Sequence, residues 1–337
     1  MAGATGVVGQ QFVYLLQDHP TFELTELIAS ERSKGKNYGD ACNHKMGLPV
    51  SKSIAEKAVV GLEEDLDCEL VFSALPSQVA GKIETRLAMD GLAVSSNAGA
   101  HRMEANVPLV IPEVNPDHFQ LIKHQKTDGF IVTNPNCTTS QLVLALKPLE
   151  DGFGLEGVLL TSMQALSGAG YPGVASLDVI DNVLPFIQGE EEKVESETLK
   201  LLGTLKEEKI VPADIAISAS CNRVNVFNGH LECVSVKLKE KTTVEAIKDE
   251  LRNFRGLPQK LKLPSAPPRP IIVMNSVDRP QPRLDRDIGQ GMASVVGRIR
   301  KDVVLDFKFI VLGHNLIRGA AGASILNAEL LHAMKYI

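Results

Sequence analysis

The chain has 337 residues, 44 % of them hydrophobic, and a formal net charge of −6. This size and composition predict a large buried core, most simply divided into two domains, and the intermixed charges argue against nucleic acid or an anionic membrane as a partner. No apolar run has membrane-spanning length and the first residues lack a secretion signal, so we expect a cytoplasmic protein. No CxxC pair occurs, which predicts free thiols and no metal site; the cysteines are Cys42, Cys68, Cys137, Cys221 and Cys233.

A glycine-rich turn opens the chain with almost nothing in front of it. Gly3, Gly6 and Gly9 in MAGATGVVG match a GxxGxxG nucleotide-binding pattern, and an apolar helix face follows at residues 12–16. In such a unit a buried strand leads into the turn, and here that strand is missing. We therefore expect a truncated chain whose sheet lacks its first strand. The alternative is that Met1 and Ala2 suffice as a strand stub.

Short apolar runs separated by helical patterns continue to about residue 132 and predict a doubly wound parallel sheet. These runs lie at residues 70–74, 92–95 and 130–133. Later strand candidates are longer, and several alternate apolar and polar residues as a half-solvated sheet does; they lie at residues 158–162, 215–219, 231–238, 294–299 and 303–312. Helices are expected around residues 178–186, at 244–254 and at 319–337, and an extended proline-rich connector at 263–270.

The segment about twenty residues after the glycines bears on the choice of cofactor, because a site for NAD carries an acidic residue there. This chain instead has Ser30, Arg32 and Ser33. The Arg32 guanidinium supplies charge and a planar fork for a 2′-phosphate, which favours NADP over NAD. The alternative is an ordinary solvated loop, and Glu31 supports that alternative.

The most informative stretch is NPNCTTS at residues 134–140, where a proline turn leads directly into an apolar helix pattern. Cys137 therefore lies in the first turn of a helix. Unpaired N–H groups and the positive end of the helix dipole lower the pKa of a thiol there and can hold an oxyanion. This placement predicts a nucleophile, whereas the other four cysteines are more simply small core or loop residues.

Motifs along the whole chain resemble those of the aspartate-β-semialdehyde dehydrogenases, in particular the archaeal and fungal-like branch. In chain order the motifs are GATGVVG, NPNCTTSQ, SGAGYPG and HNLIRGAAG. The resemblance implies reversible reduction of β-aspartyl phosphate by NADPH to aspartate semialdehyde and phosphate, a step toward lysine, methionine and threonine. It also implies a homodimer or homotetramer built on the sheet of the second domain.

The resemblance implies a fold and its domains as well. We expect an α/β protein with a Rossmann-type doubly wound parallel sheet, its first strand apparently missing, and an α+β domain for substrate binding and dimerisation. Residues 1–136 and 315–337 would form the NADP-binding domain, and residues 137–314 the catalytic and dimerisation domain. The implied cofactor contacts are Gly3, Thr5, Gly6, Val7, Val8, Ser30, Arg32, Ser33, Ser73, Ser167, Gly168 and Asn315.

The resemblance also implies roles at the reacting centre. Cys137 matches the nucleophile, His230 the acid/base and Gln164 the residue that orients the acyl group. Such a reaction needs a thiolate and a proton donor with a pKa near neutrality. His314 competes as the base, but its neighbours Asn315 and Arg318 are more typical of a cofactor and packing segment, with Asn315 implied to fix the nicotinamide amide.

The substrate would be held by charged groups that the resemblance identifies. Arg223 matches the partner of the substrate α-carboxylate, and Glu190 the carboxylate that receives the amino group. Arg102 and Lys193, helped by Asn136, match the phosphate-binding group. From the residues alone, Arg102, Lys193 and Glu190 are more often solvated surface charges, and Arg223 and His230 belong to a polar turn before a strand.

Three alternative functions stay open at this point. Malonyl-CoA reductase shares the SGAGYPG and RGAAG segments, and N-acetyl-γ-glutamyl-phosphate reductase uses similar acyl-phosphate chemistry. Asn136, directly before the cysteine, favours the amino-acid enzyme over both. The third alternative is an inactive, truncated relative that only binds NADP.

Overall fold

A parallel sheet organises the part of the chain that precedes Cys137 in this computed structural model, which describes residues 1–42 and 47–337. Strands β3 (Leu70–Ser73), β4 (Ala93–Ser96) and β5 (Phe130–Thr133) pair in that order, all parallel. A separate parallel pair is formed by β1 (Leu27–Ile28) and β2 (Val59–Val60). The strand runs predicted from the sequence for β3, β4 and β5 are confirmed to within about one residue.

Ala2 joins these two pieces of sheet. It forms parallel bridges with both Ile28 and Ser73. Its N–H donates to the carbonyl of Phe72 at 2.8 Å, and its carbonyl accepts from the N–H of Ala74 at 2.9 Å. Met1 and Ala2 thus occupy the place of the strand that leads into the glycine turn, as the stub interpretation of the sequence expects.

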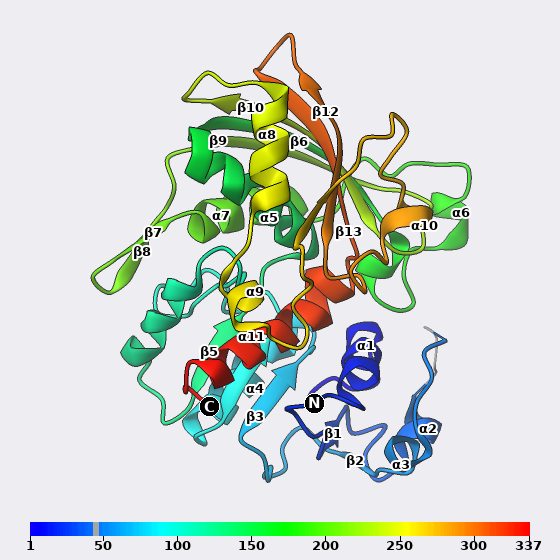
Figure 1. Ribbon diagram of the computed structural model, residues 1–337. Helices are drawn as coiled ribbons and strands as arrows, with labels where there is room; N and C mark the ends of the chain where they lie inside the picture. The colour runs from blue at the N-terminus through cyan, green and yellow to red at the C-terminus, as the bar shows by residue number, and fades with distance from the viewer. Residues whose placement is uncertain (43–46) are drawn as a thin grey trace.

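Helices cover both faces of this sheet, which confirms the doubly wound arrangement (Figure 1). On one face α1 (Val7–Leu16) and α11 (Gly322–Ala333) bring Phe12 and Ile325 into the same buried cluster as Phe72. On the other face α4 (Ser77–Met89) packs Ile83 against Val71. The short helices of this lobe are α2 (Tyr38–Ala41), α3 (Lys52–Ala55) and the 3₁₀ helix η1 (Pro116–His124).

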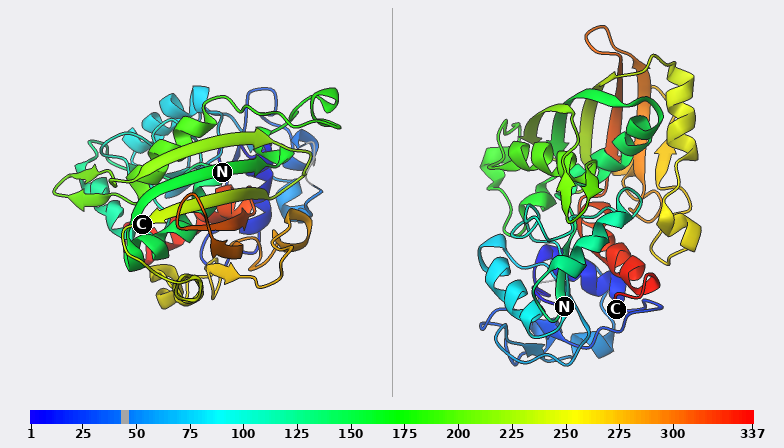
Figure 2. Two further views of the ribbon diagram at one scale, coloured as in Figure 1. Left: turned by 90° about the horizontal axis from the view of Figure 1, so that it is seen from above. Right: turned by 90° about the vertical axis from the view of Figure 1, so that its left-hand side faces the viewer.

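A larger mixed sheet forms the second lobe, and Figure 2 shows its curvature. The strand order is β11–β12–β13–β10–β6–β9, with β10 antiparallel to both of its neighbours. The strands are β6 (Leu155–Gln164), β9 (Ala216–Arg223), β10 (His230–Leu238), β11 (Ile271–Val273), β12 (Ser294–Lys301) and β13 (Phe307–Gly313). Buried and exposed residues alternate along β6 and β10, as the sequence predicts for a sheet with one solvated face.

Helix α5 (Cys137–Phe153) packs on the buried face of this sheet together with α8 (Val244–Asn253). A third helix, α7 (Glu190–Leu201), contacts β9 and α5. The remaining elements are a hairpin of β7 (Thr204–Lys206) and β8 (Lys209–Val211), α9 (Leu257–Leu261), α10 (Pro282–Asp285), the 3₁₀ turn η2 (Leu166–Ala169) and the π turn η3 (Ile317–Ala321). Among the described residues, none of the helices is both long and apolar enough to cross a bilayer.

The helix predicted around residues 178–186 is wrong. Only α6 (Ser176–Val179) is helical there, and Leu184 instead pairs with Arg223 as an antiparallel bridge. Apolar residues recur at every third position, a spacing that indicates a helix face, yet the structure leaves them exposed: Leu177, Ile180, Val183 and Phe186. Without a buried surface to cover, this short amphipathic pattern does not fold as a helix.

A buried ion pair fastens the segment after β13 to the first lobe. The Arg318 guanidinium, 0 % exposed, donates to the two carboxylate oxygens of Glu113 at 3.0 and 2.7 Å and to the Met292 carbonyl at 2.6 Å. Gly319 follows directly, and a Cβ added to it would lie 2.8 Å from the Cβ of Cys137. The ion pair therefore sets how closely this segment approaches the helix that starts at Cys137.

Replacing Arg318 by Leu should lower the free energy of unfolding by about 3–5 kcal/mol, because the Glu113 carboxylate would be left buried without its partner. Urea denaturation of the two proteins measures this difference. The matched control is the double variant Arg318→Leu/Glu113→Leu, which removes the stranded charge and should regain much of the loss. A single variant as stable as the original protein would contradict this account.

Candidate active site

Cys137 is the first residue of helix α5, as the sequence predicts. Asn136 caps this helix, since its side-chain oxygen accepts the N–H groups of Thr138 at 2.8 Å and Thr139 at 3.2 Å. The cap occupies two of the N–H groups that the sequence analysis left unpaired for an oxyanion. Among the described residues, none accepts from the N–H of Cys137, so that group is the one left for an oxyanion at this helix start.

His230, at the start of β10, faces the cysteine. Its Nε2 lies 3.1 Å from the Cys137 sulfur, and its Nδ1 accepts the backbone N–H of Ala165 at 3.0 Å. Because Nδ1 is an acceptor, the neutral imidazole carries its proton on Nε2, the nitrogen that faces sulfur. Burial, with the charges of Arg223 and His314 adding to it, holds the pKa of His230 well below its usual value, so the ring is neutral near pH 7.

The expectation of a lowered thiol pKa is wrong. Burial, and next the negative charge of Glu190, raise the pKa of Cys137 to about 12, although Arg223 and Arg102 act in the opposite direction. The effect of desolvation on the thiol pKa is therefore larger than the opposite effect of the helix N-terminus. The N–H groups of Thr138 and Thr139 there already donate to the Asn136 cap.

Glu190, the first residue of α7, links two residues that the sequence analysis placed at the site. Its carboxylate accepts from the Asn136 amide at 2.8 Å and from the Gln164 amide at 3.0 Å. Lys193 lies one helical turn further, with Nζ 3.9 Å from the Glu190 carboxylate and its side chain half exposed. The structure therefore gathers these four residues, and Glu190 is a buried hub rather than a solvated charge.

Arg223, at the end of β9, lies on the other side of the histidine. Its guanidinium donates to the Ala165 carbonyl at 2.8 Å, so it shares with His230 a contact to the same backbone residue. A Cβ added to Gly168 would lie 2.9 Å from Arg223 Nη1 and 3.1 Å from His230 Cε1. Gly168, the first glycine of the SGAGYPG motif, is therefore needed where the chain passes these two side chains.

Glu197 is a site residue that the sequence analysis missed. Its carboxylate accepts from the Arg102 guanidinium at 3.0 Å and from the Asn136 N–H at 2.6 Å, and it is 2 % exposed. It therefore joins the buried Arg102 to the residue before the nucleophile. Its spacing of seven from Glu190 puts both carboxylates on one face of α7, a signal that was present in the sequence.

The glycine turn has the geometry of a phosphate cradle. Gly3 has φ +79°, and a Cβ added to Gly9 would lie 2.0 Å from the Gly3 carbonyl oxygen. Gly6 is the N-cap of α1 and offers no side chain, so the first N–H groups of the helix, those of Val7 and Val8, have no described partner. Thr5 lies between Gly3 and Gly6, and its backbone carbonyl accepts a hydrogen bond from the Gln10 side-chain amide.

The Ser30–Ser33 turn follows β1 and is held beside the glycine turn. The Ile28 carbonyl accepts from the N–H groups of both Gly3 and Ala4, at 2.9 and 3.0 Å. Ser30 and Arg32 are exposed and Ser33 is half-buried, so these side chains are free to meet a ligand at the turn. The residues thus fit an adenosine 2′-phosphate beside a helix N-terminus.

The remaining cofactor candidates are less accessible. Ser73 is fully buried, and its hydroxyl donates to Glu84 at 2.5 Å, so the structure does not bring it to the open side of the glycine turn. Asn315 donates to the Ser167 hydroxyl at 2.8 Å and accepts the N–H of Gly229 at 2.8 Å. Asn315 therefore links Gly229, the residue directly before His230, to Ser167 in η2.

Comparison with known proteins gives the family. A family model described as "Semialdehyde dehydrogenase, NAD binding domain" matches residues 1–122, and one described as "Semialdehyde dehydrogenase, dimerisation domain" matches residues 146–318. The chain belongs to the semialdehyde dehydrogenase family. The dimerisation-domain match spans the larger sheet of this semialdehyde dehydrogenase together with helix α7.

Curated relatives are similar over almost their whole length. The aspartate-semialdehyde dehydrogenase of Archaeoglobus fulgidus is 54% identical, over 99% of this chain and 98% of its own. The enzyme of Schizosaccharomyces pombe is 47% identical, over 97% and 95% of the two chains. The crystal structure of the Candida albicans enzyme with NADP has a TM-score of 0.93 at 44% identity, covering 100% of this chain and 98% of that chain. These relatives do not favour the malonyl-CoA reductase alternative.

The raised thiol pKa predicts how Cys137 reacts in the substrate-free protein. Only the thiolate is alkylated, and a pKa of about 12 lies above the accessible range. Iodoacetamide should therefore modify the Cys137 peptide about tenfold faster for each pH unit between pH 7 and 10, without a plateau. Mass spectrometry of that peptide over time measures the rate.

The Glu190→Gln variant is the matched control for this prediction. It keeps the hydrogen-bonding shape but removes the negative charge that raises the thiol pKa, so the alkylation rate at pH 8 should rise severalfold. A plateau in the rate below pH 9 in the unmodified protein would contradict the assignment of a raised pKa.

Proposed function

We propose that this chain catalyses the reversible, NADP-dependent conversion of β-aspartyl phosphate to aspartate semialdehyde and phosphate. The observation that carries the proposal is the contact of the Cys137 sulfur with His230 Nε2, 3.1 Å apart, at the start of a helix and among arginines. The name shared by the curated relatives and the Candida albicans structure supports the same reaction and the same cofactor.

The cofactor site is formed by residues that fit NADP. Gly3, Gly6 and the free N–H groups at the start of α1 would hold the pyrophosphate, and Arg32 with Ser30 and Ser33 the 2′-phosphate. Asn315, Ser167 and Gly168 would border the nicotinamide. When bound, NADPH supplies the hydride for the reaction.

The Cys137 thiolate would attack the acyl carbon of β-aspartyl phosphate and expel phosphate, which leaves a thioester on the sulfur. The N–H of Cys137 stabilises the oxyanion of this step, and Gln164 orients the acyl group. His230 Nε2 would give a proton to the thioester oxygen as the acyl carbon is reduced, which forms the hemithioacetal, and would take that proton back when the hemithioacetal collapses to the aldehyde and the Cys137 thiolate. In the reverse direction the histidine takes that proton from the same oxygen.

The charged residues around the sulfur would bind the substrate. Arg223 pairs with the α-carboxylate and Glu190 with the amino group, while Arg102 and Lys193, together with Asn136, bind the phosphate. Arg102 is held in place by Glu197, and the half-exposed Lys193 is free to swing toward an anion.

We infer a homodimer or homotetramer built on the outer face of the larger sheet. Leu159 on β6 is 47% exposed there, and Thr161 on the same strand, Ser218 on β9 and Cys233 on β10 are exposed beside it. A second copy would cover this face. The same free cysteines support a reducing compartment, and we propose the cytoplasm.

The direct test is formation of NADPH, followed by its absorbance, when the protein meets aspartate semialdehyde, phosphate and NADP. We expect phosphate-dependent activity that Cys137→Ala abolishes. His230→Asn should lower turnover by about two to four orders of magnitude, since it removes the proton-transfer group. Activity of His230→Asn close to that of the original protein would remove His230 from this role.

Specificity for NADP has its own test in Arg32→Ala. Loss of a charge-assisted hydrogen bond at an exposed site should raise the KM for NADP by about tenfold and leave the KM for NAD nearly unchanged. Glu31→Gln, on the same turn, is the matched control and should change neither value strongly. Equal changes for the two cofactors would contradict a 2′-phosphate contact.

A further inference from the structure

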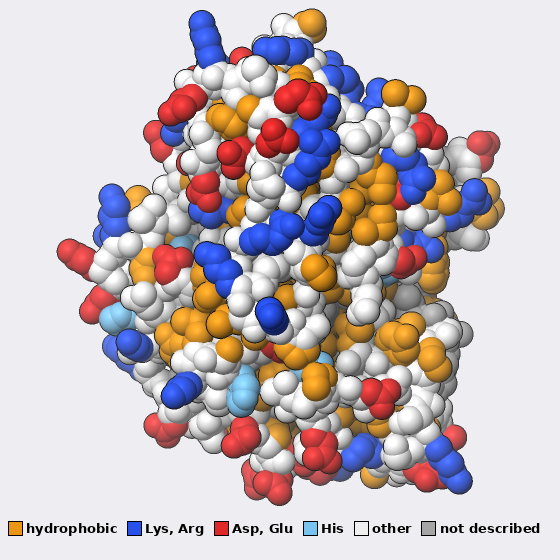
Figure 3. Space-filling view, in the orientation of Figure 1, with side chains coloured by type: hydrophobic (Ala, Val, Ile, Leu, Met, Phe, Trp, Pro, Cys, Tyr) orange, Lys and Arg blue, Asp and Glu red, His pale blue; other side chains and the backbone are white. Residues whose placement is uncertain are grey.

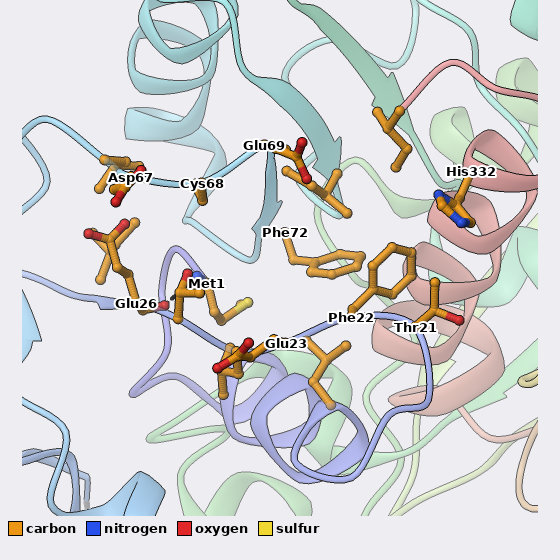
Figure 4. Close-up of a pocket in the computed structure, with 17 residues that line it drawn as sticks. Met1, Thr21, Phe22, Glu23, Glu26, Asp67, Cys68, Glu69, Phe72 and His332 are labelled. Carbon is orange, nitrogen blue, oxygen red and sulfur yellow. Dashed lines mark hydrogen bonds between the residues drawn. The ribbon is translucent and has the colours of Figure 1, made fainter.

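Glu232 on β10 carries a carboxyl group that is buried away from water. Many carboxylates of this chain meet solvent: Figure 3 shows them spread over one face of the molecule, and Figure 4 shows the exposed ones of Glu23, Asp67 and Glu69 around a cavity of the first lobe. Glu232 is instead 0% exposed and lies two residues after His230 on the buried face of the strand. The proposed reaction gives this carboxyl group no role.

Helix α5 meets β10 through two side-chain contacts in register. Cys137 and Gln141 are four residues apart on the helix, so they lie on the same face, one turn apart. His230 and Glu232 are two residues apart on the strand, so they also share a face. The Cys137 sulfur lies 3.1 Å from His230 Nε2. One helical turn further, Gln141 Nε2 donates to Glu232 Oε1 at 2.6 Å.

Gln141 is held between β10 and β13. Its amide donates to the carboxyl of Glu232 and, through a longer bond of 3.4 Å, to the backbone carbonyl of His230. Gly313 on β13 lies opposite His230, and a Cβ added to it would overlap the Gln141 side chain. Gln141 is 0% exposed. Its amide therefore ties the first turns of α5 to the backbone of the histidine that faces the sulfur.

Two buried oxygens of this contact lack a hydrogen-bond donor. Among the described residues, neither Glu232 Oε2 nor Gln141 Oε1 has a partner. An ionised carboxyl and an amide oxygen can only accept, so an ionised Glu232 would leave both oxygens unpaired at a cost in stability. A protonated Oε2 is a donor instead. An acid and an amide that already share one N–H···O bond can then close a ring with an O–H···O bond.

The immediate surroundings of Glu232 favour the protonated form. Burial raises the pKa of Glu232 well above its usual value, and the hydrogen bond from Gln141 acts in the opposite direction but more weakly. The residues opposite it on the neighbouring strands are Val311 on β13 and Ser162 on β6, and neither carries a charge.

The titratable groups around Glu232 supply no positive charge. They are His230 on the same strand, Cys137 on α5 and Cys221 on β9. Burial lowers the pKa of the histidine and raises those of both thiols to about 12, so all three groups are neutral near pH 7. Arg223 acts on the pKa of Cys137 but not on that of Glu232. Among the described residues, none therefore offsets a negative charge on this carboxyl group.

We propose that Glu232 is a neutral acid joined to Gln141 by two hydrogen bonds, and that this acid–amide pair holds the Cys137 sulfur against His230. Gln141 Nε2–H donates to Glu232 Oε1, and Glu232 Oε2–H donates to Gln141 Oε1. Both side chains are fully buried and act through Cys137 and His230, so they are positioning residues. The effect on turnover rests on the proposed function, whereas the protonation and the pairing do not.

A neutral acid suits this place better than a carboxylate. The Cys137 thiol must lose its proton to react, and the charge of Glu190 already raises its pKa. A second negative charge, one helical turn behind the sulfur, would raise the thiol pKa further. The protonated pair supplies two directional hydrogen bonds and adds no charge.

The neutral acid is tested without substrate or cofactor by Glu232→Gln. The infrared spectrum at pH 7 should lose the C=O band of a protonated carboxylic acid in this variant and keep its carboxylate bands. Above about pH 4.3 the unfolded chain ionises Glu232 while the folded protein does not, so the stability of the original protein falls with pH on this account. The Tm of the variant relative to the original should therefore rise by a few degrees between pH 5 and pH 8. Loss of a carboxylate band, or a constant Tm difference, would overturn the neutral acid.

The positioning role is tested by the double variant Gln141→Leu/Glu232→Leu, which removes both partners and leaves neither buried without the other. Its Tm should stay within a few degrees of the original. Its kcat for aspartate semialdehyde should fall at least about tenfold, with KM changed less than about twofold, because a displacement of about 1 Å of reacting groups costs up to about a hundredfold. The matched control is the exchange variant Gln141→Glu/Glu232→Gln, which keeps both hydrogen bonds and should keep kcat within about threefold.

A double leucine variant that is as stable as the original protein and turns over at the same rate would overturn the positioning role. Should that variant not fold, the exchange variant decides, because a loss of kcat beyond about tenfold there would overturn the pair. A crystal structure of the double leucine variant needs no activity: the distance from the Cys137 sulfur to His230 Nε2 should exceed 3.1 Å by about 1 Å, and an unchanged distance would overturn the proposal. An original protein that does not turn over aspartate semialdehyde would contradict the proposed function, and the infrared band and this distance would still decide on the pair.

Discussion

The start of helix α5 is the constraint on which the rest of the site depends. Strand β5 ends the parallel sheet, a short turn follows, and Cys137 then begins the helix that supports the larger sheet. Asn136 caps that helix with its side chain and is itself held by the carboxylates of Glu190 and Glu197. The position of the sulfur is thus set jointly by both lobes, and so is its distance from His230.

This arrangement gathers several ionisable groups out of water, and the balance between their charges and their burial sets the pKa of the Cys137 thiol. Each buried carboxylate of α7 accepts hydrogen bonds from a neighbour, and Arg102 pairs with one of them. For the Cys137 thiol, burial and the charge of Glu190 outweigh the opposing charges of Arg223 and Arg102, so its pKa rises. An anionic substrate that draws Arg223 and Lys193 toward the sulfur would favour the thiolate, which couples activation of the nucleophile to substrate binding.

Much of the framework was predictable because it depends on local patterns. Apolar runs gave β3, β4 and β5, and the proline turn before Cys137 gave the start of α5. The spacing of Gly3, Gly6 and Gly9 predicted the phosphate-binding turn before α1. What failed depends on packing: residues 178–186 have a helical spacing but no surface to cover, and the thiol pKa follows from burial by distant segments. Glu197 was overlooked although its spacing from Glu190 was visible, because its partner Arg102 lies far away in the sequence.

The central claim is that Cys137 carries the acyl group during the reaction. The most direct measurement mixes the protein with β-aspartyl phosphate in the absence of NADPH, quenches with acid and analyses the cysteine peptides by mass spectrometry. The account predicts an aspartyl thioester on the Cys137 peptide, together with released phosphate, and its disappearance when NADPH is added before the quench. Phosphate release without any adduct on Cys137, or an adduct on another cysteine instead, would contradict it.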